Sequence, residues 1–333
     1  MPSPAPTTDV IGIGSAIVDI IGRCDDAFLA RHGCPKGNMR LVDQATIATL
    51  YKNMGPAVET SGGSVANTMA GIASFGGSAG FIGKVADDEF GRIFSHDIRA
   101  AGVAFDSRPA TGGAPTSRSL ILVTPDGERT MNTFLGISTD LGEHEIDADR
   151  IASARIVYLE GYLFDRPEGM KAFREAAAIA RKAGRRVALS LSDAFCVDRH
   201  RAAFRDFVKS GVDIVFANES EITSLYETTS FDDAARRIQA DTKLAALTRS
   251  GAGSVVVADG RMIQIPVQKV AKLVDTTGAG DLYAAGFLFG LSRDKPLDIC
   301  GRLGSLAAAE VIGHIGPRPE KPLADLAKCA GLL

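Results

Sequence analysis

Short runs of β-branched and other apolar residues alternate with longer alanine-rich segments along this chain of 333 residues. Segments 168–184 and 232–240 have the composition of helices and lie between such runs. Strands joined through helices run parallel, because each helical crossover returns the chain to the same edge of the sheet. We therefore expect an α/β fold with a mainly parallel central sheet covered by helices. The strand candidates are 10–13, 156–159, 187–191, 213–216, 244–247 and 254–257.

Two regions break this alternation. The first is residues 15–42, and the second is the pair 117–123 and 129–134, which flank a Pro-Asp-Gly turn and predict a hairpin. Neither region is large enough to fold alone. We therefore expect a small β lid, formed from about 15–42 and 116–135, within a domain that spans 9–333. Residues 1–8 are rich in proline and are expected to form a disordered tail.

Composition excludes several classes of protein. The net charge of −3, with dispersed basic residues, gives no basic surface for nucleic acid or an anionic membrane. No uncharged apolar stretch reaches the roughly 18 residues of a membrane span, and the amino terminus lacks the basic region of a secretion signal. The five cysteines and five histidines are scattered without metal-ligand or disulfide spacing. We expect a cytoplasmic monomer or homodimer with a small-molecule ligand.

A glycine-rich run, Asp275-Thr276-Thr277-Gly278-Ala279-Gly280-Asp281, precedes an apolar helical segment. At such a helix start, the free N–H groups of Gly278, Ala279 and Gly280 can converge on an anion. The carboxylate of Asp281 beside that anion can accept the proton of an attacking hydroxyl group, which is the chemistry of phosphoryl transfer. The alternative is an ordinary glycine turn in which Asp281 caps the helix.

A second glycine cluster suggests a site for a polyol. Gly62 and Gly63 permit close approach of a ligand, and Asn67 follows in a helical segment with a donor and an acceptor suited to a sugar diol. Asp19 is a lone acid in the apolar run 17–21, and a buried carboxylate needs a partner such as a hydroxyl group. The alternatives are a helix-start turn for the glycines and an exposed strand face for Asp19.

Together these motifs resemble the ribokinase-like carbohydrate and nucleoside kinases, the PfkB family. Residues 62–91 are similar to the first signature of the family and 275–281 to the second. Asn218-Glu219-Ser220-Glu221 resembles its NxxE element. Its nucleotide loop is matched by 248–253, which contains Thr248, Gly251 and Gly253. The resemblance implies a three-layer α/β/α fold.

The resemblance also implies roles for individual residues. ATP is the expected phosphoryl donor, with Mg²⁺ held through water near Asn218 and Glu221, and with Thr248, Gly251 and Gly253 at the nucleotide. Asp281 is the expected base, and Asp19, Gly62, Gly63 and Asn67 are expected to hold the sugar. Asp275 and Thr277 are candidates for a monovalent cation such as K⁺. Arg129 is expected to approach the phosphates, the alternative being a solvated arginine.

The acceptor is expected to be a nucleoside. Ser64 stands where ribokinases carry a lysine, whereas 188–195 resembles an adenosine-kinase segment that ends in a stacking phenylalanine, here Phe195. The opening segment 12–20, with Ser15 and Ile17, resembles adenosine kinases too, although Ser15 and Asp193 depart from their pattern. For Phe195 the alternative is a core aromatic. We expect phosphorylation of adenosine to AMP; the alternatives are a sugar kinase (fructose, ribose or a keto-deoxy sugar) and a nonenzymatic sugar- or nucleotide-binding regulator.

Overall fold

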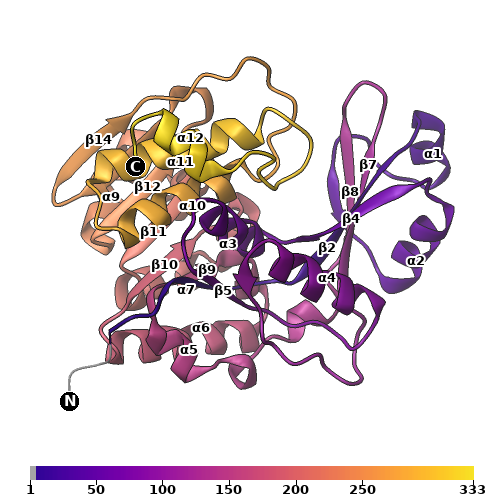
Figure 1. Ribbon diagram of the computed structural model, residues 1–333, viewed down its shortest axis with the longest axis horizontal. Helices are drawn as coiled ribbons and strands as arrows, with labels where there is room; N and C mark the ends of the chain where they lie inside the picture. Colours follow the sequence, from indigo (N-terminus) through magenta and orange to yellow (C-terminus); the bar gives the residue numbers. More distant parts are fainter. Residues whose placement is uncertain (1–4) are drawn as a thin grey trace.

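A nine-stranded sheet runs through the main body of the computed structural model, which describes residues 5–333 (Figure 1). The strand order is β14-β13-β12-β11-β10-β9-β1-β5-β6. All neighbouring pairs are parallel except those made by β13, which is antiparallel to both β12 and β14. The strands are β1 (Thr8–Ile13), β5 (Ala79–Ile82), β6 (Val103–Ala104), β9 (Ala154–Glu160), β10 (Arg186–Ser190), β11 (Ile214–Asn218), β12 (Leu244–Thr248), β13 (Ser254–Ala258) and β14 (Arg261–Ile265).

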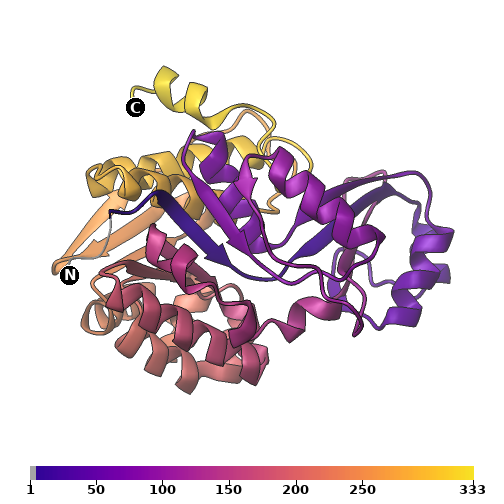
Figure 2. The same cartoon turned by 60° about the horizontal axis from the view of Figure 1, so that its bottom comes forward.

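Helices cover both faces of this sheet, as the turned view shows (Figure 2). Each face has its own apolar core, one centred on residues such as Phe287 and the other on residues such as Phe204. The expected three-layer α/β/α arrangement is thereby confirmed. One layer holds α3 (Ser64–Ser74), α4 (Glu89–Ala100), α10 (Ala279–Ser292), α11 (Leu297–Val311) and α12 (Leu323–Cys329); the other holds α5 (Ala148–Ser153), α6 (Pro167–Lys182), α7 (Ala194–Gly211), α8 (Glu219–Tyr226) and α9 (Phe231–Asp241).

A second sheet of five strands lies beside the main body, at the right of Figure 1. Its order is β3-β8-β7-β2-β4, and it contains the predicted hairpin as β7 and β8. The elements of this small sheet are β2 (Ile17–Arg23), β3 (Met39–Leu41), β4 (Ala57–Gly62), β7 (Ser117–Val123) and β8 (Arg129–Phe134), and the helices between its strands are α1 (Asp26–Arg31) and α2 (Gln44–Asn53). Short 3₁₀ turns occur at Gly136–Asp140, Glu143–Glu145, Gly161–Asp165 and Ser250–Ala252.

The expected bounds of the lid and of the tail need correction. The lid extends beyond the predicted segment 15–42, because the small sheet also includes β4, which pairs antiparallel with β2. The polar and small residues of β4 give no strand signal of their own. The predicted tail of residues 1–8 includes residues that belong to the fold. Strand β1 begins at Thr8, and the N–H of Thr7 donates to the carbonyl of Ser153 at 2.9 Å. Residues 1–4 of that tail lie outside the described residues.

Two further features bear on the expected class. Among the helices of residues 5–333, none combines the length and the apolar composition of a membrane span. All five cysteines are free thiols, so no disulfide contributes to the fold. The parallel strands place the loops that follow β1, β9, β10, β11 and β12 at one edge of the main sheet, where ligands of α/β proteins bind.

Candidate active site

The two glycine motifs meet where the amino-terminal ends of α3 and α10 lie side by side (Figure 1). Asp281 stands in the first turn of α10, and two side chains of α3 bind its carboxylate. The hydroxyl of Ser64 donates to Oδ1 at 2.6 Å, and Nδ2 of Asn67 donates to Oδ2 at 2.9 Å. Asp281 is therefore held by a neighbouring helix and does not cap its own, so the capping alternative does not describe it.

Burial and neighbouring donors set the proton affinity of Asp281. Burial raises its pKa, while the hydrogen bonds from Ser64 and Asn67 and the charge of Arg318 oppose that rise. A raised pKa brings a carboxylate nearer to the range in which a general base works best. The surroundings of Asp281 thus suit an acceptor of a hydroxyl proton.

Gly62 and Asp19 face each other on paired strands. Ile17 of β2 is in register with Gly62 of β4, and a Cβ added to Gly62 would collide with the Asp19 carboxylate. A larger residue at position 62 would therefore displace the Asp19 carboxylate. Asp19 is 7% exposed, so it does not belong to an exposed strand face. Burial raises its pKa to about 7, against the opposing charges of Arg318 and Arg129.

A cavity of about 450 Å³ opens between the two sheets beside these residues. Its lining includes Ser15, Asp19, Gly63, Ser64 and Glu160, and Ile17 also lines it. The volume falls in the range of small-molecule sites, roughly 300–1,000 Å³. Its lining also includes the apolar side chains of Met39, Leu41, Met131, Leu135, Leu163 and Phe195, and the charged side chains of Asp165, Arg166, Asp193 and Arg199. The cavity therefore offers polar groups for hydroxyl groups and apolar surface for a flat ring.

Glu160 is a site residue that the sequence prediction missed. It ends β9, is 1% exposed, and accepts the N–H of Ser15 through Oε1 at 2.8 Å. Its second oxygen, Oε2, has no hydrogen-bond partner within residues 5–333. Burial raises the pKa of Glu160 to about 7. The available signal was the acid that follows the apolar strand 156–159.

Phe195 lies in the first turn of α7 and lines the cavity. It is 73% exposed, which excludes the alternative of a core aromatic. Asp193, which departs from the adenosine-kinase pattern, is the N-cap of this helix. Its side chain accepts the N–H groups of Phe195 at 2.7 Å and Cys196 at 3.1 Å. Asp193 thus fixes the helix start that carries Phe195.

Arg129 reaches from β8 of the small sheet to the loop before α10. It forms an ion pair with Oδ2 of Asp275 at 2.6 Å and donates to the hydroxyl of Thr277 at 3.0 Å. Its Nη2 is buried without a hydrogen-bond partner in the described part of the chain. Arg129 is therefore not a solvated arginine. A buried guanidinium nitrogen without an acceptor, beside a helix start, is suited to an anion.

The anion hole differs in one residue from the expected set. The N–H of Ala279 donates to the carbonyl of Thr276 at 3.2 Å, so it is already engaged. Within residues 5–333 the N–H groups of Gly278, Gly280 and Asp281 have no such acceptor. The sequence pattern could not reveal this, because the tight turn before α10 is set by the αL conformation of Gly278 (φ 77°).

The donor atoms of Asn218 and Glu221 bear on how Mg²⁺ can be held. Asn218 and Glu221 form a capping box of α8: Oδ1 of Asn218 accepts the Glu221 N–H, and Glu221 accepts the N–H and Nδ2 of Asn218. Nowhere in residues 5–333 do three or more His, Cys, Asp or Glu side chains gather as a metal cage. This suits a Mg²⁺ ion held mainly by phosphates and water.

The carboxylate of Asp275 offers no free oxygen for a monovalent cation. Oδ1 accepts the N–H of Thr277 at 3.0 Å and its hydroxyl at 2.8 Å, while Oδ2 pairs with Arg129 and accepts the N–H of Gly316 at 3.0 Å. These groups do not fit a bound K⁺ ion in this arrangement. K⁺ binding stays a prediction, and no step of the reaction is assigned to it.

The expected nucleotide loop lies further along the same sheet edge. Thr248 ends β12 in register with Asn218 of β11, Gly251 lies in the 3₁₀ turn that follows, and Gly253 is the C-cap of that turn. None of these residues lines the cavity between the sheets. They instead extend the site from the start of α10 along the carboxyl ends of the strands, where a second ligand can lie.

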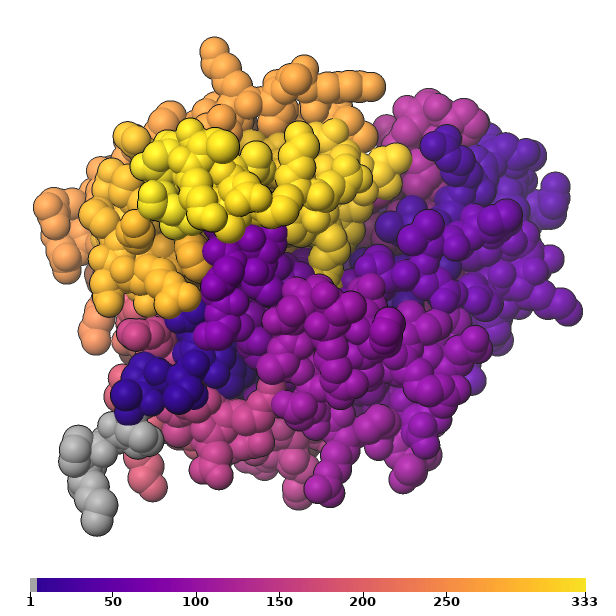
Figure 3. Space-filling model, viewed as in Figure 1, coloured from indigo at the N-terminus to yellow at the C-terminus, as the bar shows by residue number. Residues whose placement is uncertain are grey.

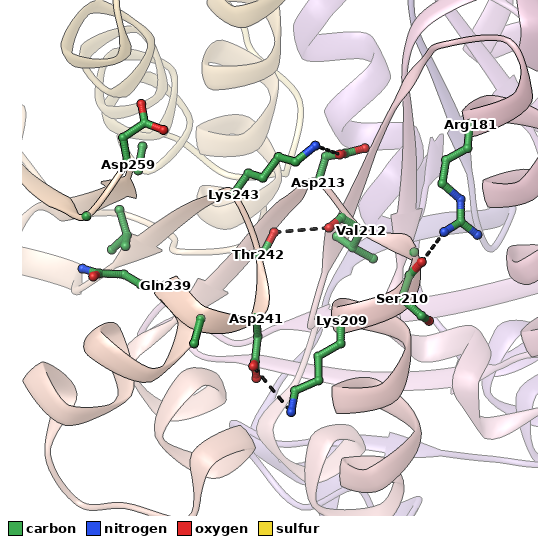
Figure 4. Close-up of a pocket in the computed structure, with 15 residues that line it drawn as sticks. Arg181, Lys209, Ser210, Val212, Asp213, Gln239, Asp241, Thr242, Lys243 and Asp259 are labelled. Atoms are coloured by element: carbon green, nitrogen blue, oxygen red, sulfur yellow. Dashed lines mark hydrogen bonds and ion pairs between the residues drawn. The ribbon is translucent and has the colours of Figure 1, made fainter.

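A separate depression of about 530 Å³ lies at the opposite edge of the main sheet (Figure 4). Its charged side chains pair with one another, Lys209 with Asp241 and Lys243 with Asp213, each at 3.5 Å. It contains none of the residues selected from the sequence. This depression is therefore not the candidate active site.

Known proteins resemble this chain over nearly its whole length. An adenosine kinase from Sinorhizobium meliloti is 53% identical, with a TM-score of 0.90, over 97% of this chain and 99% of that one. A probable sugar kinase from Rhizobium etli CFN 42 is 49% identical, with a TM-score of 0.92, over 98% and 100%. Adenosine kinase 2 of Arabidopsis thaliana is 26% identical over 94% of this chain and 96% of its own.

These relatives are named as kinases, so the chain is an enzyme that uses ATP, typically with Mg²⁺, and the alternative of a nonenzymatic regulator is set aside. The pattern of the pfkB carbohydrate kinases matches residues 48–323, which include both glycine motifs and Asp281. The chain belongs to the pfkB family of carbohydrate kinases.

Proposed function

We propose that this kinase transfers the γ-phosphoryl group of ATP to the primary hydroxyl of a nucleoside, and that the nucleoside is adenosine. The observation that carries the proposal is a set of acceptors without donors. Oδ1 of Asn67 and Oε2 of Glu160 are buried and have no partner within residues 5–333. Buried polar atoms are normally hydrogen-bonded. With the buried carboxylate of Asp19, they support a ligand that supplies several hydroxyl groups, as ribose does.

The apolar side chains of the cavity lining support a base attached to that sugar. Phe195 on α7 and Met39, Leu41 and Met131 on the small sheet belong to this lining. Phe195, Met39 and Leu41 are exposed large apolar side chains that share one cavity, and such a group of side chains is suited to a ligand. A flat heterocycle between Phe195 and the small sheet would bury these surfaces and gain stacking energy.

The chemistry follows from the position of Asp281. Its carboxylate takes the proton of the primary hydroxyl as the oxygen attacks the γ-phosphorus, the new O–P bond forms, and the bond to the ADP oxygen breaks. The N–H groups of Gly278, Gly280 and Asp281 and the guanidinium of Arg129 lie where they can bind the transferred phosphoryl group. Mg²⁺, when bound with ATP, neutralises charge on the phosphates.

A sugar kinase is the second candidate, and a specific observation favours it. Glu160 adds a second buried carboxylate to that of Asp19 in the cavity lining, and two carboxylates together can bind more hydroxyl groups than a ribose attached to a base offers. The Rhizobium etli neighbour, which is named a probable sugar kinase, is nearly as similar as the Sinorhizobium neighbour.

An ADP-release assay over a panel of acceptors tests the proposal. The panel holds adenosine, guanosine, cytidine, ribose, fructose and a keto-deoxy sugar, each with ATP and Mg²⁺. The proposal expects the highest kcat/KM with adenosine. A higher value with a free sugar would replace it by the second candidate. The D281N variant, which keeps the fold of the site but cannot accept the proton, serves as the background.

A further inference from the structure

Sequence patterns did not point to Arg318, yet its half-buried guanidinium binds the segment at the start of α3. It lies in the loop between α11 and α12, in the sequence Gly316-Pro317-Arg318-Pro319. Burial lowers its pKa to about 10, and the charges of Asp97, Asp19 and Asp281 act against that change. A guanidinium that is partly removed from water is costly unless carboxylates and acceptors surround it. The surroundings of Arg318 supply both.

Every hydrogen bond of Arg318 goes to the segment that begins α3. Nε and Nη2 donate to the carbonyl of Ser61 at 3.2 and 2.7 Å, Nη2 also donates to the Ser61 hydroxyl at 3.0 Å, and Nη1 donates to the carbonyl of Ala66 at 2.9 Å. Asp97 of α4 holds the same segment, because it accepts the N–H of Ser61 at 2.7 Å and its hydroxyl at 2.5 Å. Gly62, Gly63 and Ser64 lie between these fixed points.

The loop that carries Arg318 is itself fixed to the start of α10. The N–H of Gly316 donates to Asp275, and a Cβ added to Gly278 would lie 2.8 Å from Cα of Pro317. The view in Figure 3 shows this carboxyl-terminal segment, in yellow, lying directly on the purple residues of the amino-terminal half. The loop of Arg318 therefore spans the two helix starts whose residues meet at Asp281.

We propose that Arg318 is a positioning residue for phosphoryl transfer: its half-buried guanidinium holds the α3 start against the α10 start, with its positive charge among the carboxylates of the site. This role rests on the proposed function, in which Asp281 is the base. A purely structural arginine would only hold Ser61 and Ala66. A positioning arginine also sets the pH at which Asp281 can work.

The charges around Asp281 support this second part of the role. Asp19, Glu160 and Glu221 supply negative charge, Tyr158 is a buried phenol and Tyr162 an exposed one, and the charge of Asp281 acts on all five groups. The positive charge of Arg318 lowers the pKa of Asp281. The charges of Arg318 and Arg129 together lower the pKa of Asp19. Loss of Arg318 leaves several carboxylates near one another with less positive charge to balance them.

The test compares R318M, R318K and S61A by the pH dependence of kcat between pH 5 and 9, with whichever acceptor the wild-type enzyme turns over. For R318M we expect kcat to fall at neutral pH and its acid limb to move up by about one pH unit, the scale of one nearby charge. R318K keeps the charge and should keep the limb of the wild type. S61A removes a hydrogen-bond partner but no charge, so it should lower kcat without moving the limb. R174M, on an exposed helix face, is the control for unchanged activity.

A second measurement needs no substrate. Urea unfolding of the unliganded proteins should show that the free energy of unfolding falls more between pH 6 and 9 in R318M than in the wild type, because the buried carboxylates then bind protons up to a higher pH. An unchanged limb together with an unchanged pH dependence of stability overturns the proposal. If R318M does not fold, a limb displaced by a full unit in R318K overturns it. Failure of adenosine as a substrate would remove the proposed nucleoside but not affect the unfolding result.

Discussion

The hydroxyl of Ser64 donates a hydrogen bond of 2.6 Å to Oδ1 of Asp281, a residue 217 positions later in the chain. This contact joins the two glycine motifs into one site. Ser64 also lines the cavity, so the same side chain contacts both the candidate base and the space for the acceptor. Ser64, which stands where ribokinases carry a lysine, thus binds and orients the candidate base Asp281.

Replacement of Asp281 by asparagine should lower kcat by about 10²-fold or more, because the amide can still accept from Ser64 but cannot take the proton. Steady-state ADP release measures kcat, and equilibrium binding of the acceptor should change little. D325N is the matched control, since Asp325 also stands in the first turn of a helix but is solvent-exposed. Near-normal turnover by D281N would show that another group is the base.

The F195A variant should raise the KM for adenosine about tenfold, the scale of one lost base–aromatic stack. The KM for a free hexose should change much less, since a hexose has no base to reach Phe195. The control is M262A, which truncates another exposed apolar side chain, on β14 at the end of the main sheet. An equal rise in KM for adenosine and for the hexose would show that the adenine ring does not stack on Phe195.

The E160Q variant should change how stability depends on pH. The pKa of Glu160 is raised to about 7 in the folded protein, so the wild type loses stability as the pH rises from about 4.5 to 7 and the buried carboxyl ionises. E160Q cannot ionise at this position. The difference in free energy of unfolding between E160Q and the wild type should therefore shift in favour of E160Q by up to about 3 kcal/mol from pH 4 to pH 8.

Urea unfolding at both pH values measures this difference. The side-chain amide introduced by E160Q can still accept the N–H of Ser15, so the comparison isolates the charge. E175Q, on the exposed side of α6, is the control. A difference between E160Q and wild type that is the same at pH 4 and pH 8 would contradict the buried, proton-binding carboxyl.

Replacement of Arg129 by glutamine should raise the KM for ATP about tenfold, because the phosphates lose a charge-assisted partner. It should also destabilise the fold by about 3 kcal/mol, since Asp275 is left buried without its counter-charge. The double variant R129Q/D275N removes that lone charge and should recover most of the stability but not the KM. Recovery of both would mean that Arg129 serves Asp275 alone.

Local patterns in the sequence predicted the elements that local interactions form. The hairpin of β7 and β8 follows from alternating residues around a Pro-Asp-Gly turn, and α10 begins where glycines give way to an apolar run. Asp281 and Asn67 could be predicted because each lies in a motif with a recognisable spacing. Their mutual hydrogen bond could not, because it depends on how α3 and α10 pack.

The residues that were missed owe their roles to tertiary contacts. Strand β4 has no strand pattern of its own and is defined by its pairing with β2. Arg318 lies in a loop without helical or strand periodicity, and its role comes from carboxylates contributed by α4, β2 and α10. In the sequence, Glu160 is only an acid that follows a predicted strand. The fold places it in the cavity lining, where its Oε2 has no hydrogen-bond partner within residues 5–333.

The ion pair between Arg129 and Asp275 has a consequence for how a nucleotide binds. Arg129 belongs to the small sheet and Asp275 to the main body, so the pair is an internal counterion bond across the two parts of the molecule. Nη1 of Arg129 holds Asp275, whereas Nη2 has no partner within residues 5–333, so a phosphate at the start of α10 can bind the same guanidinium without breaking the pair. A nucleotide bound in this way would add a second bridge between the small sheet and the main body, beside the one that the protein itself provides.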